Sequence, residues 1–309
     1  MFEMTTEPDA KVIQTPDIIK HWQDFGKIYS EHFEYNTQPM LYSLIMNLQI
    51  FQAEKLLELS CGGGKSISVV LSMKKPDCEY IATDISKNML NLSMSRMEYI
   101  ETDFKGNLQF FDEFAFNEKE KTNYKNYFPN NKTSFYLMNN EVLEFKDESF
   151  DICFSNLSLM IVENPEKMIS ESFRVLKKGG KAGFTVWGNQ EKSLFFSLPK
   201  KIVQKYKINL PNDRGCFHLN DRKLLITMFE NAGFKNILCW SQFFAYNFQT
   251  EEDFNLHLDT KGIKKSFDLI PNEEERKKIR KEVLDEFMGF IQKGEPVGLD
   301  IFFIIGEKL

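Results

Sequence analysis

Apolar residues recur along this chain with two different spacings. Near the start, Trp22, Phe25 and Tyr29 recur at the spacing of one helix face, and residues 17–50 are predicted to form two helices. The next segment, EKLLELS at residues 54–60, is a short apolar run that leads into glycines. This pattern predicts a buried strand followed by a tight turn and a helix.

The same alternation of strand and helix continues to the end of the chain. Further strands are predicted for 78–84, 134–140, 149–157, 181–188, 235–243 and 297–309. Further helices are predicted for 65–75, 86–100, 164–180, 220–232 and most of 251–292. Ser86 is the expected N-cap of one helix, and Pro165 begins another that Gly179 and Gly180 are expected to end. Strands that alternate with helices predict an α/β protein with a Rossmann-like, doubly wound, mostly parallel sheet and helices on both faces.

Residues 102–132 break this rhythm. The segment is polar, rich in asparagine and weakly periodic, and we expect it to be an insertion or a long surface loop. The sequence has no repeat with a period of about 20 to 50 residues and no linker rich in glycine, serine or proline. We therefore predict a single domain, residues 1–309, with helical additions.

The stretch ELSCGGGKS, residues 58–66, decides most of what the sequence indicates about function. A P-loop requires a glycine five positions before Gly64, but Leu59 stands there, inside the predicted strand. The dinucleotide pattern G-x-G-x-x-G matches Gly62 and Gly64 and fails at Ile67. The stretch therefore disfavours both a P-loop and a typical dinucleotide turn.

A third pattern, E-x-G-x-G-x-G, matches better, with Ser60 in place of the first glycine. Gly62 and Gly64 let the backbone turn sharply and approach a ligand closely, and the N–H groups that begin the next helix suit a carboxylate. Asp84 lies 20 residues beyond Gly64 at the end of the second strand, where an acid can accept both hydroxyls of a ribose. This spacing favours a ligand-binding role for Asp84 over that of a solvated acid at a strand end.

These residues resemble motif I and the acidic strand end of class I S-adenosylmethionine-dependent methyltransferases, of the type that acts on small molecules. NNEVLEFKDESFDICFSNLSL and NPEKMISESFRVLKKGGKAGFTVWG are similar to later segments of that superfamily, so the resemblance covers about residues 54–188. FHLNDRKLLITMFENAGFKNI and the final IFFIIGEKL resemble its late helix and strands. The resemblance implies a seven-stranded sheet, S-adenosyl-L-methionine as the cofactor and methyl transfer as the reaction.

The resemblance also implies roles for individual residues. The expected cofactor-binding residues are Glu58, Ser60, Cys61, Gly62, Gly64, Asp84, Ile85, Asn139, Asn140, Glu141 and Ser155. On this match Asn139 contacts the adenine amino group, and Asn140 offers its backbone N–H to the ring. Ser60 and Asn139 replace the family's usual glycine and aspartate, and Glu144 stands where proline is common. These departures leave open a member that no longer transfers methyl groups.

The resemblance divides the predicted domain by role. Lid helices are expected at 15–50, the cofactor-binding core at 54–188 with the insertion at 102–132, and substrate-side helices and the last strands at 189–309.

Two residues are candidates for catalysis. They are Tyr29 in the lid and His218 in the RGCFHLN loop, the latter as a base. Trp22, next to Tyr29 on the predicted helix face, is better explained by packing onto the core. Methyl transfer from a sulfonium needs a base only when the acceptor is an unactivated hydroxyl or a protonated amine. The absence of an obvious base therefore does not exclude activity.

Charge and cysteine content narrow the partners and the compartment. The net charge of −6 disfavours nonspecific binding to nucleic acid or anionic membranes. The five cysteines show no C-x-x-C spacing and no zinc-like cluster, so we expect reduced thiols and no metal. The sequence shows no apolar run of about 18 residues and no secretory pattern, so a cytoplasmic protein without a membrane span is expected. The expected partner is a small-molecule acceptor, and a protein partner stays open.

Three other functions stay open at this point. A methyltransferase-like scaffold in a protein complex is motivated by Ser60 and by the predicted insertion. A methyltransferase of protein or RNA would use the helical additions and basic runs such as ERKKIRK, although a solvated helix face explains these runs as well. A nicotinamide enzyme is the most distant alternative and predicts binding of NAD over S-adenosylmethionine.

Overall fold

The structure, a computed structural model, describes residues 15–97, 102–104, 132–210, 215–246, 248 and 250–309. Of the predicted insertion at 102–132, residues 105–131 therefore lie outside the described part of the chain. The N-terminal residues 1–14 lie outside it as well.

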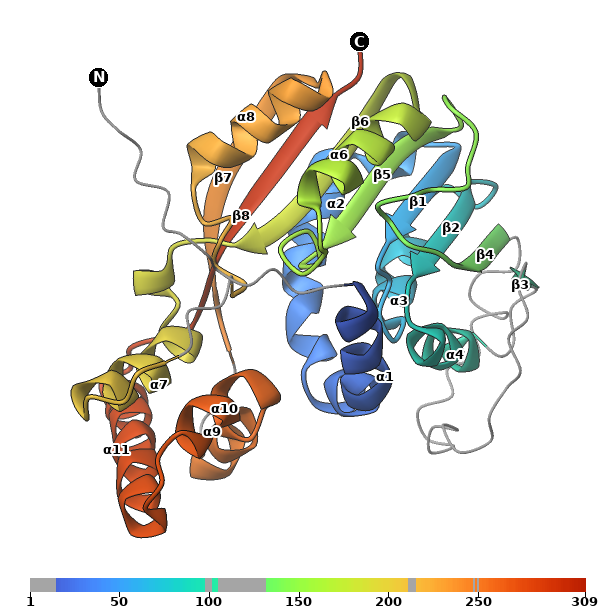
Figure 1. The fold of residues 1–309 in the computed structure, drawn as a ribbon. Helices are drawn as coiled ribbons and strands as arrows, with labels where there is room; N and C mark the ends of the chain where they lie inside the picture. Colours follow the sequence, from blue (N-terminus) through green and yellow to red (C-terminus); the bar gives the residue numbers. More distant parts are fainter. Residues whose placement is uncertain (1–14, 98–101, 105–131, 211–214, 247, 249) are drawn as a thin grey trace, which may run out of the picture. The chain divides into compact units, whose positions relative to one another are not determined.

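The strands form one sheet of eight strands in the order β3-β4-β2-β1-β5-β6-β8-β7 (Figure 1). Their bounds are β1 Lys55–Leu59, β2 Glu79–Asp84, β3 Thr102–Phe104, β4 Lys132–Leu137, β5 Phe150–Asn156, β6 Leu176–Trp187, β7 Lys235–Ala245 and β8 Gly298–Glu307. The strands β3, β4, β2, β1, β5 and β6 pair in parallel. The predicted doubly wound, mostly parallel sheet is confirmed, and the three-residue edge strand β3 adds to the seven strands expected.

The last strand reverses the direction of the sheet. The N–H of Lys308 donates to the carbonyl of Gly180, and the N–H of Gly188 donates to the carbonyl of Asp300. Residue numbers that rise along β6 as they fall along β8 mean that these two strands run antiparallel.

The helices follow the predicted order, with additions. Their bounds are α1 Thr15–His32, α2 Gln38–Leu48, α3 Lys65–Met73, α4 Lys87–Arg96, α6 Pro165–Val175, α7 Leu194–Lys205, α8 Arg222–Ala232, α9 Glu251–Leu258, α10 Lys261–Asp268 and α11 Glu273–Gln292, with the 3-10 helices η1 Glu34–Thr37, η2 Ile50–Gln52 and η5 Gln190–Lys192. Ser86 is the N-cap of α4, as predicted, because its side chain accepts the N–H of Met89. Helix α7, which contains Pro199, lies in the segment 189–309 where helices were expected, but its bounds were not predicted.

The predicted end of the helix at 164–180 is wrong. Helix α6 ends at Val175, and the residues from Leu176 onward belong to β6. The reason is strand pairing: the N–H of Gly179 donates to the carbonyl of Lys308, and Gly180 accepts from the same residue. Contacts with a distant part of the chain therefore take these glycines into the sheet.

The described chain falls into two compact units. Among the described residues, the large unit comprises 15–186, 221–240 and 302–309, and the small unit comprises 187–220 and 241–301. This division into compact units does not test whether the chain is a single domain. The predicted domain and the roles of its parts therefore stay predictions.

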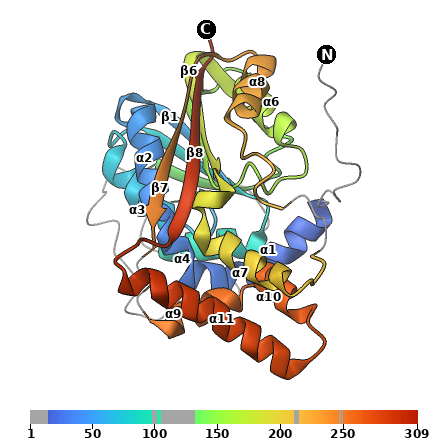
Figure 2. The same cartoon turned by 90° about the vertical axis from the view of Figure 1, so that its left-hand side faces the viewer.

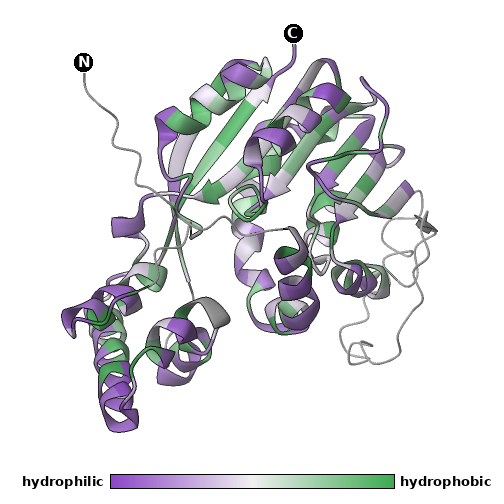
Figure 3. Cartoon of the chain, in the orientation of Figure 1, coloured by the Kyte–Doolittle hydropathy of each residue, from purple (hydrophilic) through white to green (hydrophobic). Residues whose placement is uncertain are grey.

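In the large unit, helices cover the sheet on both faces. Helices α2 and α3 lie on one face, and α6 and α8 lie on the other (Figures 1 and 2). Burial agrees with this arrangement, because consecutive residues of β1 and β2 are buried rather than every second one. Figure 3 shows the corresponding concentration of hydrophobic residues along these strands.

In the small unit, α7, α9, α10 and α11 share an apolar core (Figure 2). Phe254 of α9 and Phe287 of α11 stack with ring centroids 4.5 Å apart at 8°, and both side chains are fully buried. His257 lies in the same core at 1% exposure, stacked on Phe195, with Nε2 2.6 Å from the carbonyl oxygen of Phe195. Since a carbonyl only accepts, Nε2 carries a proton, and the ring is neutral at pH 7 because burial lowers its pKa.

The buried His257 predicts a loss of stability in acid. Burial lowers the pKa of His257 from 6.5 to about 3. Between these two values the unfolded chain binds a proton that the folded chain does not, so the free energy of unfolding falls as pH drops below about 6.5. Between pH 7 and pH 5 this contribution amounts to about 2 kcal/mol. Urea unfolding at both pH values measures it.

The control for this prediction is His257→Gln, which keeps an N–H donor and removes the titrating group. The free energy of unfolding of the parent, minus that of the variant, should fall by about 2 kcal/mol from pH 7 to pH 5. A difference that does not change with pH would contradict a neutral buried ring. Comparing the two proteins at each pH cancels the titration of every other group.

Candidate functional site

The glycine stretch forms a loop between β1 and α3, at the carboxyl end of the sheet. Strand β1 lies between β2 and β5. The chain continues from β1 to β2 on one side, whereas the later strands β5 and β6 lie on the other side, so the strand order reverses at β1. In doubly wound sheets, ligands bind beside such a reversal, outside the carboxyl ends of the strands. The N–H of Cys61 donates to the carbonyl of Thr83 at 2.9 Å, which fixes the start of the loop to β2.

Asp84 at the end of β2 binds the glycine loop directly. Its Oδ2 accepts the N–H of Gly62 at 3.0 Å, and its Oδ1 accepts the N–H of Ser86 at 2.8 Å. The carboxyl group is buried, and burial raises its pKa from 3.8 to about 7 against the lowering effect of these backbone donors. The structure therefore brings together the two sequence features, 20 residues apart, on which the ligand-binding prediction depends.

Ser60, the departure from the usual glycine, has a structural explanation. Its φ of 57° lies in the left-handed region, which is strained for a residue with a side chain. Its Oγ accepts the side-chain N–H of Asn140 at 2.7 Å, and Asn140 Oδ1 in turn accepts from the hydroxyl of Thr83 at 3.0 Å. This buried network links β1, β2 and the loop after β4, so the serine is built into the site.

Other predicted site residues support the loop from below and from the side. Glu58 is buried under it and accepts from the hydroxyl of Tyr80 and from Ser66 Oγ, and burial raises the pKa of Glu58 to about 7. Ser155 Oγ donates to the carbonyl of Leu59 at 2.6 Å. Cys61 is buried, and burial raises the pKa of its thiol well above the usual range. These side chains hold the strands and the loop together.

The loop after β4 carries the remaining predicted cofactor residues. Asn139 Oδ1 accepts the N–H of Glu141 at 2.9 Å, an Asx turn that still leaves the oxygen a second lone pair. The carboxylate of Glu141 accepts the N–H groups of Glu163 and Asn164, both at 3.1 Å. Glu141 therefore fixes the start of α6. Ile85 is half-buried directly after Asp84. Contacts of these residues with a cofactor stay a prediction.

The two catalytic candidates belong to different units. Tyr29 lies on α1 in the large unit, half-buried, with its ring edge-on to Trp22 at a centroid distance of 5.2 Å and an angle of 79°. His218 lies in the small unit and is half-buried. Their roles in catalysis stay predictions.

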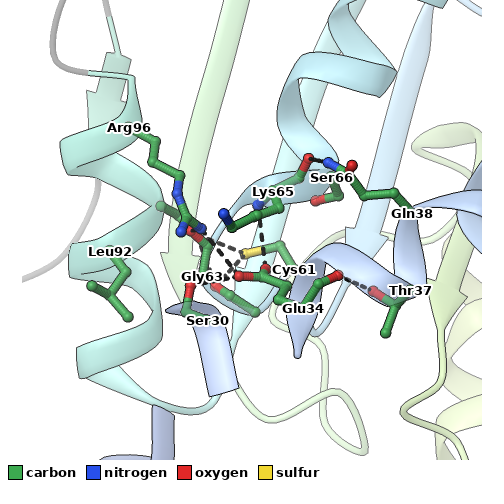
Figure 4. Close-up of polar contacts among 12 residues, drawn as sticks. Ser30, Glu34, Thr37, Gln38, Cys61, Gly63, Lys65, Ser66, Leu92 and Arg96 are labelled. Carbon is green, nitrogen blue, oxygen red and sulfur yellow. Dashed lines mark hydrogen bonds and ion pairs between the residues drawn. The ribbon is translucent and has the colours of Figure 1, made fainter. Parts of the chain in front are cut away.

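The sequence did not indicate Glu34 and Arg96, which meet at the glycine loop (Figure 4). The Glu34 carboxylate accepts the N–H of Lys65 at 3.2 Å, the hydroxyl of Ser30 at 2.6 Å and Arg96 Nη1 at 3.1 Å. Arg96 Nη1 also donates to the carbonyl of Gly63. A Cβ on Gly63 would overlap Ser30 Oγ, so the middle glycine is what lets α1 approach the loop. Glu34 and Arg96 are 62 positions apart and lie on different helices, so no periodic pattern in the sequence predicts their contact.

Arg174 of α6 holds the loop that follows β4. Its guanidinium donates to the carbonyls of Leu143 and Phe145 and forms ion pairs with Asp147 and Glu171. In Arg174→Ala these two carbonyls lose their hydrogen-bond donor and the two carboxylates lose their ion-pair partner. We therefore expect the variant to lower the free energy of unfolding by about 2–3 kcal/mol. Urea unfolding measures this loss.

The control is Lys281→Ala, which breaks the exposed pair with Asp285 on α11. It should cost less than about 0.5 kcal/mol, since exposed pairs contribute little. Equal losses in the two variants would show that Arg174 acts only as a surface charge.

The described residues lack two further kinds of feature. No group of three or more histidine, cysteine, aspartate or glutamate side chains there is arranged to hold a metal ion. No helix in that part of the chain is long and apolar enough to cross a membrane.

A family model matches part of the chain. A sequence model of the family described as methyltransferase domain matches residues 57–184, from β1 to β6. Over residues 57–184 the chain is therefore similar to the methyltransferase superfamily that its glycine loop and Asp84 resemble. The cofactor of this superfamily is S-adenosylmethionine. The match contains both the glycine loop and Asp84.

Individual relatives of this chain are distant. The biotin biosynthesis bifunctional protein BioHC of Teredinibacter turnerae is 30% identical over 131 residues, which are 41% of this chain and 18% of that protein. The chain spans 18%, 44% and 56% of the lengths of three curated relatives that it matches.

Solved structures show the same fold. Phosphoethanolamine N-methyltransferase 2 of Haemonchus contortus, in complex with phosphomonomethylethanolamine and S-adenosylhomocysteine, has a TM-score of 0.54 at 17% identity, covering 96% of this chain and 60% of that one. The [4+2]-cyclase SpnF has a TM-score of 0.53 at 13% identity, covering 97% of this chain and 98% of that one. At these identities the likeness concerns the fold alone.

Proposed function

We propose that this protein transfers a methyl group from S-adenosylmethionine to a small-molecule acceptor by in-line displacement. The observation that carries the proposal is the hydrogen bond from the N–H of Gly62 to the buried carboxylate of Asp84. It joins a glycine loop to an acid at the end of β2, beside the reversal of strand order. An acid in this place suits a ribose, and a glycine loop that begins a helix suits a charged group near the backbone.

The residues present fit the parts of this cofactor. Asp84 offers carboxylate oxygens to the ribose hydroxyls, and burial in the protein strengthens such hydrogen bonds. Asn139 has acceptor capacity for the adenine amino group. The loop from Ser60 to Gly64, with the N-terminus of α3, is proposed to hold the amino-acid end. Glu58, Cys61, Ser155, Asn140 and Glu141 then act through the network that shapes this cradle.

The cofactor, when bound, supplies a methyl group on a positively charged sulfur that an acceptor lone pair can displace, leaving a neutral thioether. The protein then mainly has to orient donor and acceptor and exclude water, and orientation contributes up to about 7–11 kcal/mol to such reactions. An acceptor that must lose a proton also needs a base, for which His218 and Tyr29 are the proposed residues.

A small molecule is the proposed class of acceptor. A curated relative supports it, because that protein is named for biotin biosynthesis. The net charge of −6 argues against an extended nucleic-acid substrate.

A second candidate is a scaffold that keeps the fold without methyl transfer. The observation that favours it is Glu34, whose carboxylate lies on the glycine loop where a ligand would approach. The name of SpnF, a cyclase with the same fold, also shows that this fold serves other roles.

Calorimetric titration of the full chain with S-adenosylmethionine and S-adenosylhomocysteine tests the proposal. Micromolar binding of both is the expected result, and it would justify a screen of metabolites for methyl acceptors. If a protein shown to be folded by circular dichroism bound neither ligand, the scaffold would replace the enzyme as the better account.

A further inference from the structure

The carboxylate of Glu34 is held on the glycine loop through both of its oxygens (Figure 4). Oε1 accepts the N–H of Lys65, the first residue of α3, at 3.2 Å. Oε2 accepts from Ser30 Oγ at 2.6 Å and from Arg96 Nη1 at 3.1 Å. The side chains of Glu34 and Arg96 are only 6% and 9% exposed, so a buried ion pair lies directly on the loop.

The position of this carboxylate also suits an anionic group of a ligand. The N-terminus of α3 carries partial positive charge, and its first N–H points at the carboxylate. Arg96 adds a full positive charge whose planar fork matches a carboxylate. A side chain of the protein therefore occupies a place with the chemistry of an anion-binding site.

The loop lies close to this carboxylate. A Cβ on Gly62 would lie 3.1 Å from Glu34 Oε1, and a Cβ on Gly63 would lie 2.7 Å from Oε2. Both glycines belong to the loop that we assign to the amino-acid end of the cofactor. A ligand carboxylate that approaches them meets the like charge of Glu34 on its way to Arg96 and to the N–H of Lys65.

We propose that Glu34 and Arg96 determine how the amino-acid end of the cofactor is recognised. The cofactor carboxylate replaces the Glu34 carboxylate on Arg96 and on the N–H of Lys65. Glu34 therefore competes with every ligand that carries this carboxylate and leaves a nucleoside without it unaffected. The inference rests on the proposed function, because it concerns the same cofactor at the same loop.

The test compares two ligands that differ only in the amino-acid end. S-adenosylhomocysteine carries it, and 5′-methylthioadenosine has the same adenosine and thioether without it. Both are titrated into the full chain and into Glu34→Gln, in which the side chain still accepts hydrogen bonds but has no charge. Glu34→Gln should bind S-adenosylhomocysteine at least about tenfold more tightly than the parent and 5′-methylthioadenosine within about twofold.

The matched control is Glu31→Gln, which makes the same change of charge one turn away on α1. The side chain of Glu31 is 37% exposed, and its Oε1 lies 4.0 Å from Lys27 Nζ. Both ligands should bind this variant as they bind the parent. Tighter binding of S-adenosylhomocysteine to Glu31→Gln as well would attribute the effect to net charge and overturn the role of Glu34.

The remaining outcomes separate the inference from the proposed function. Equal or weaker binding of S-adenosylhomocysteine to Glu34→Gln, with 5′-methylthioadenosine unchanged, would refute competition by Glu34. Weaker binding would indicate that Glu34 contacts the ammonium group of the ligand. If neither ligand bound the parent or any variant, the proposed function itself would be wrong.

A second variant keeps the test decisive if the buried charge of Arg96 unfolds Glu34→Gln. Glu34→Leu/Arg96→Leu replaces the whole ion pair, and apolar pairs often replace buried ion pairs without loss of stability. This variant loses both the competing carboxylate and the guanidinium, so the tighter binding of S-adenosylhomocysteine expected when only the charge of Glu34 is removed should not appear. A gain of about tenfold or more in its affinity, relative to that for 5′-methylthioadenosine, would overturn the assignment of Arg96.

Discussion

Asp84→Ala is expected to abolish measurable binding of S-adenosylmethionine. The variant removes two carboxylate acceptors proposed for the ribose hydroxyls, and it removes the anchor of the Gly62 N–H at 3.0 Å. Hydrogen bonds to a charged group contribute about 1.5–3 kcal/mol each, so two of them correspond to a loss of about 10²–10⁴ in affinity. Calorimetric titration measures the loss.

The control for Asp84 is Asp77→Ala, at an exposed position in the turn before β2. It removes the same side chain away from the carboxyl end of the sheet, and affinity should stay within about twofold of the parent. Similar losses in the two variants would place the cofactor elsewhere.

The titration of Asp84 adds a signature that a structural role would not produce. Burial, and after it the nearby charge of Glu34, raise the pKa of Asp84 to about 7 against the backbone donors. Because ribose hydroxyls donate to the ionised form, affinity should weaken as pH falls through about 7, by up to about tenfold per pH unit. Asp84→Asn should lack this dependence. A parent affinity that does not change between pH 8 and pH 6 would contradict the assignment.

Gly64→Ala is expected to cause the largest loss of stability among single changes in the loop. Gly64 has φ 84°, which strains any residue with a Cβ, and its Cβ would lie 2.7 Å from the Cα of Ser93. That atom belongs to the backbone of α4, so it cannot turn away as a side chain can. Strain and overpacking together should lower the free energy of unfolding by about 3–5 kcal/mol, measured by urea unfolding.

The matched control is Gly179→Ala, because Gly179 has φ 79° and no atom within 4 Å of its would-be Cβ. This variant carries the strain without the clash and should lose only about 1–2 kcal/mol. The difference between the two variants measures the packing of α4 on the loop. Equal losses would mean that the loop and α4 separate easily.

The cofactor residues of the sequence prediction differ in how the structure positions them. The spacing between the glycines and Asp84 predicted that they meet, and the hydrogen bond between Gly62 and Asp84 joins them. The sequence also marked Ser60 as a departure from the family's usual glycine, and its hydrogen bond with Asn140 makes it part of a network with Thr83. A single sequence shows that a residue is unusual, but only its neighbours in space show what supports it.

The sequence by itself determined the features that depend on neighbouring residues. Apolar runs and helical periodicity gave the order of strands and helices, because these patterns follow from the geometry of each element. Ser86 was recognisable as an N-cap, because a cap bonds within its own turn. The loop and Asp84 were recognisable because a strand–turn–helix–strand unit of parallel sheet fixes their separation along the chain.

Only the tertiary structure decided the features that join distant parts of the chain. The hydrogen bonds of Gly179 and Gly180 with Lys308, and the burial of His257, depend on partners far away in sequence. The pairing of Glu34 with Arg96 is of the same kind, since it requires α1 to pack on α4. Each such contact arises when several elements pack at once, and no local pattern of residues encodes the distance between two side chains on different elements.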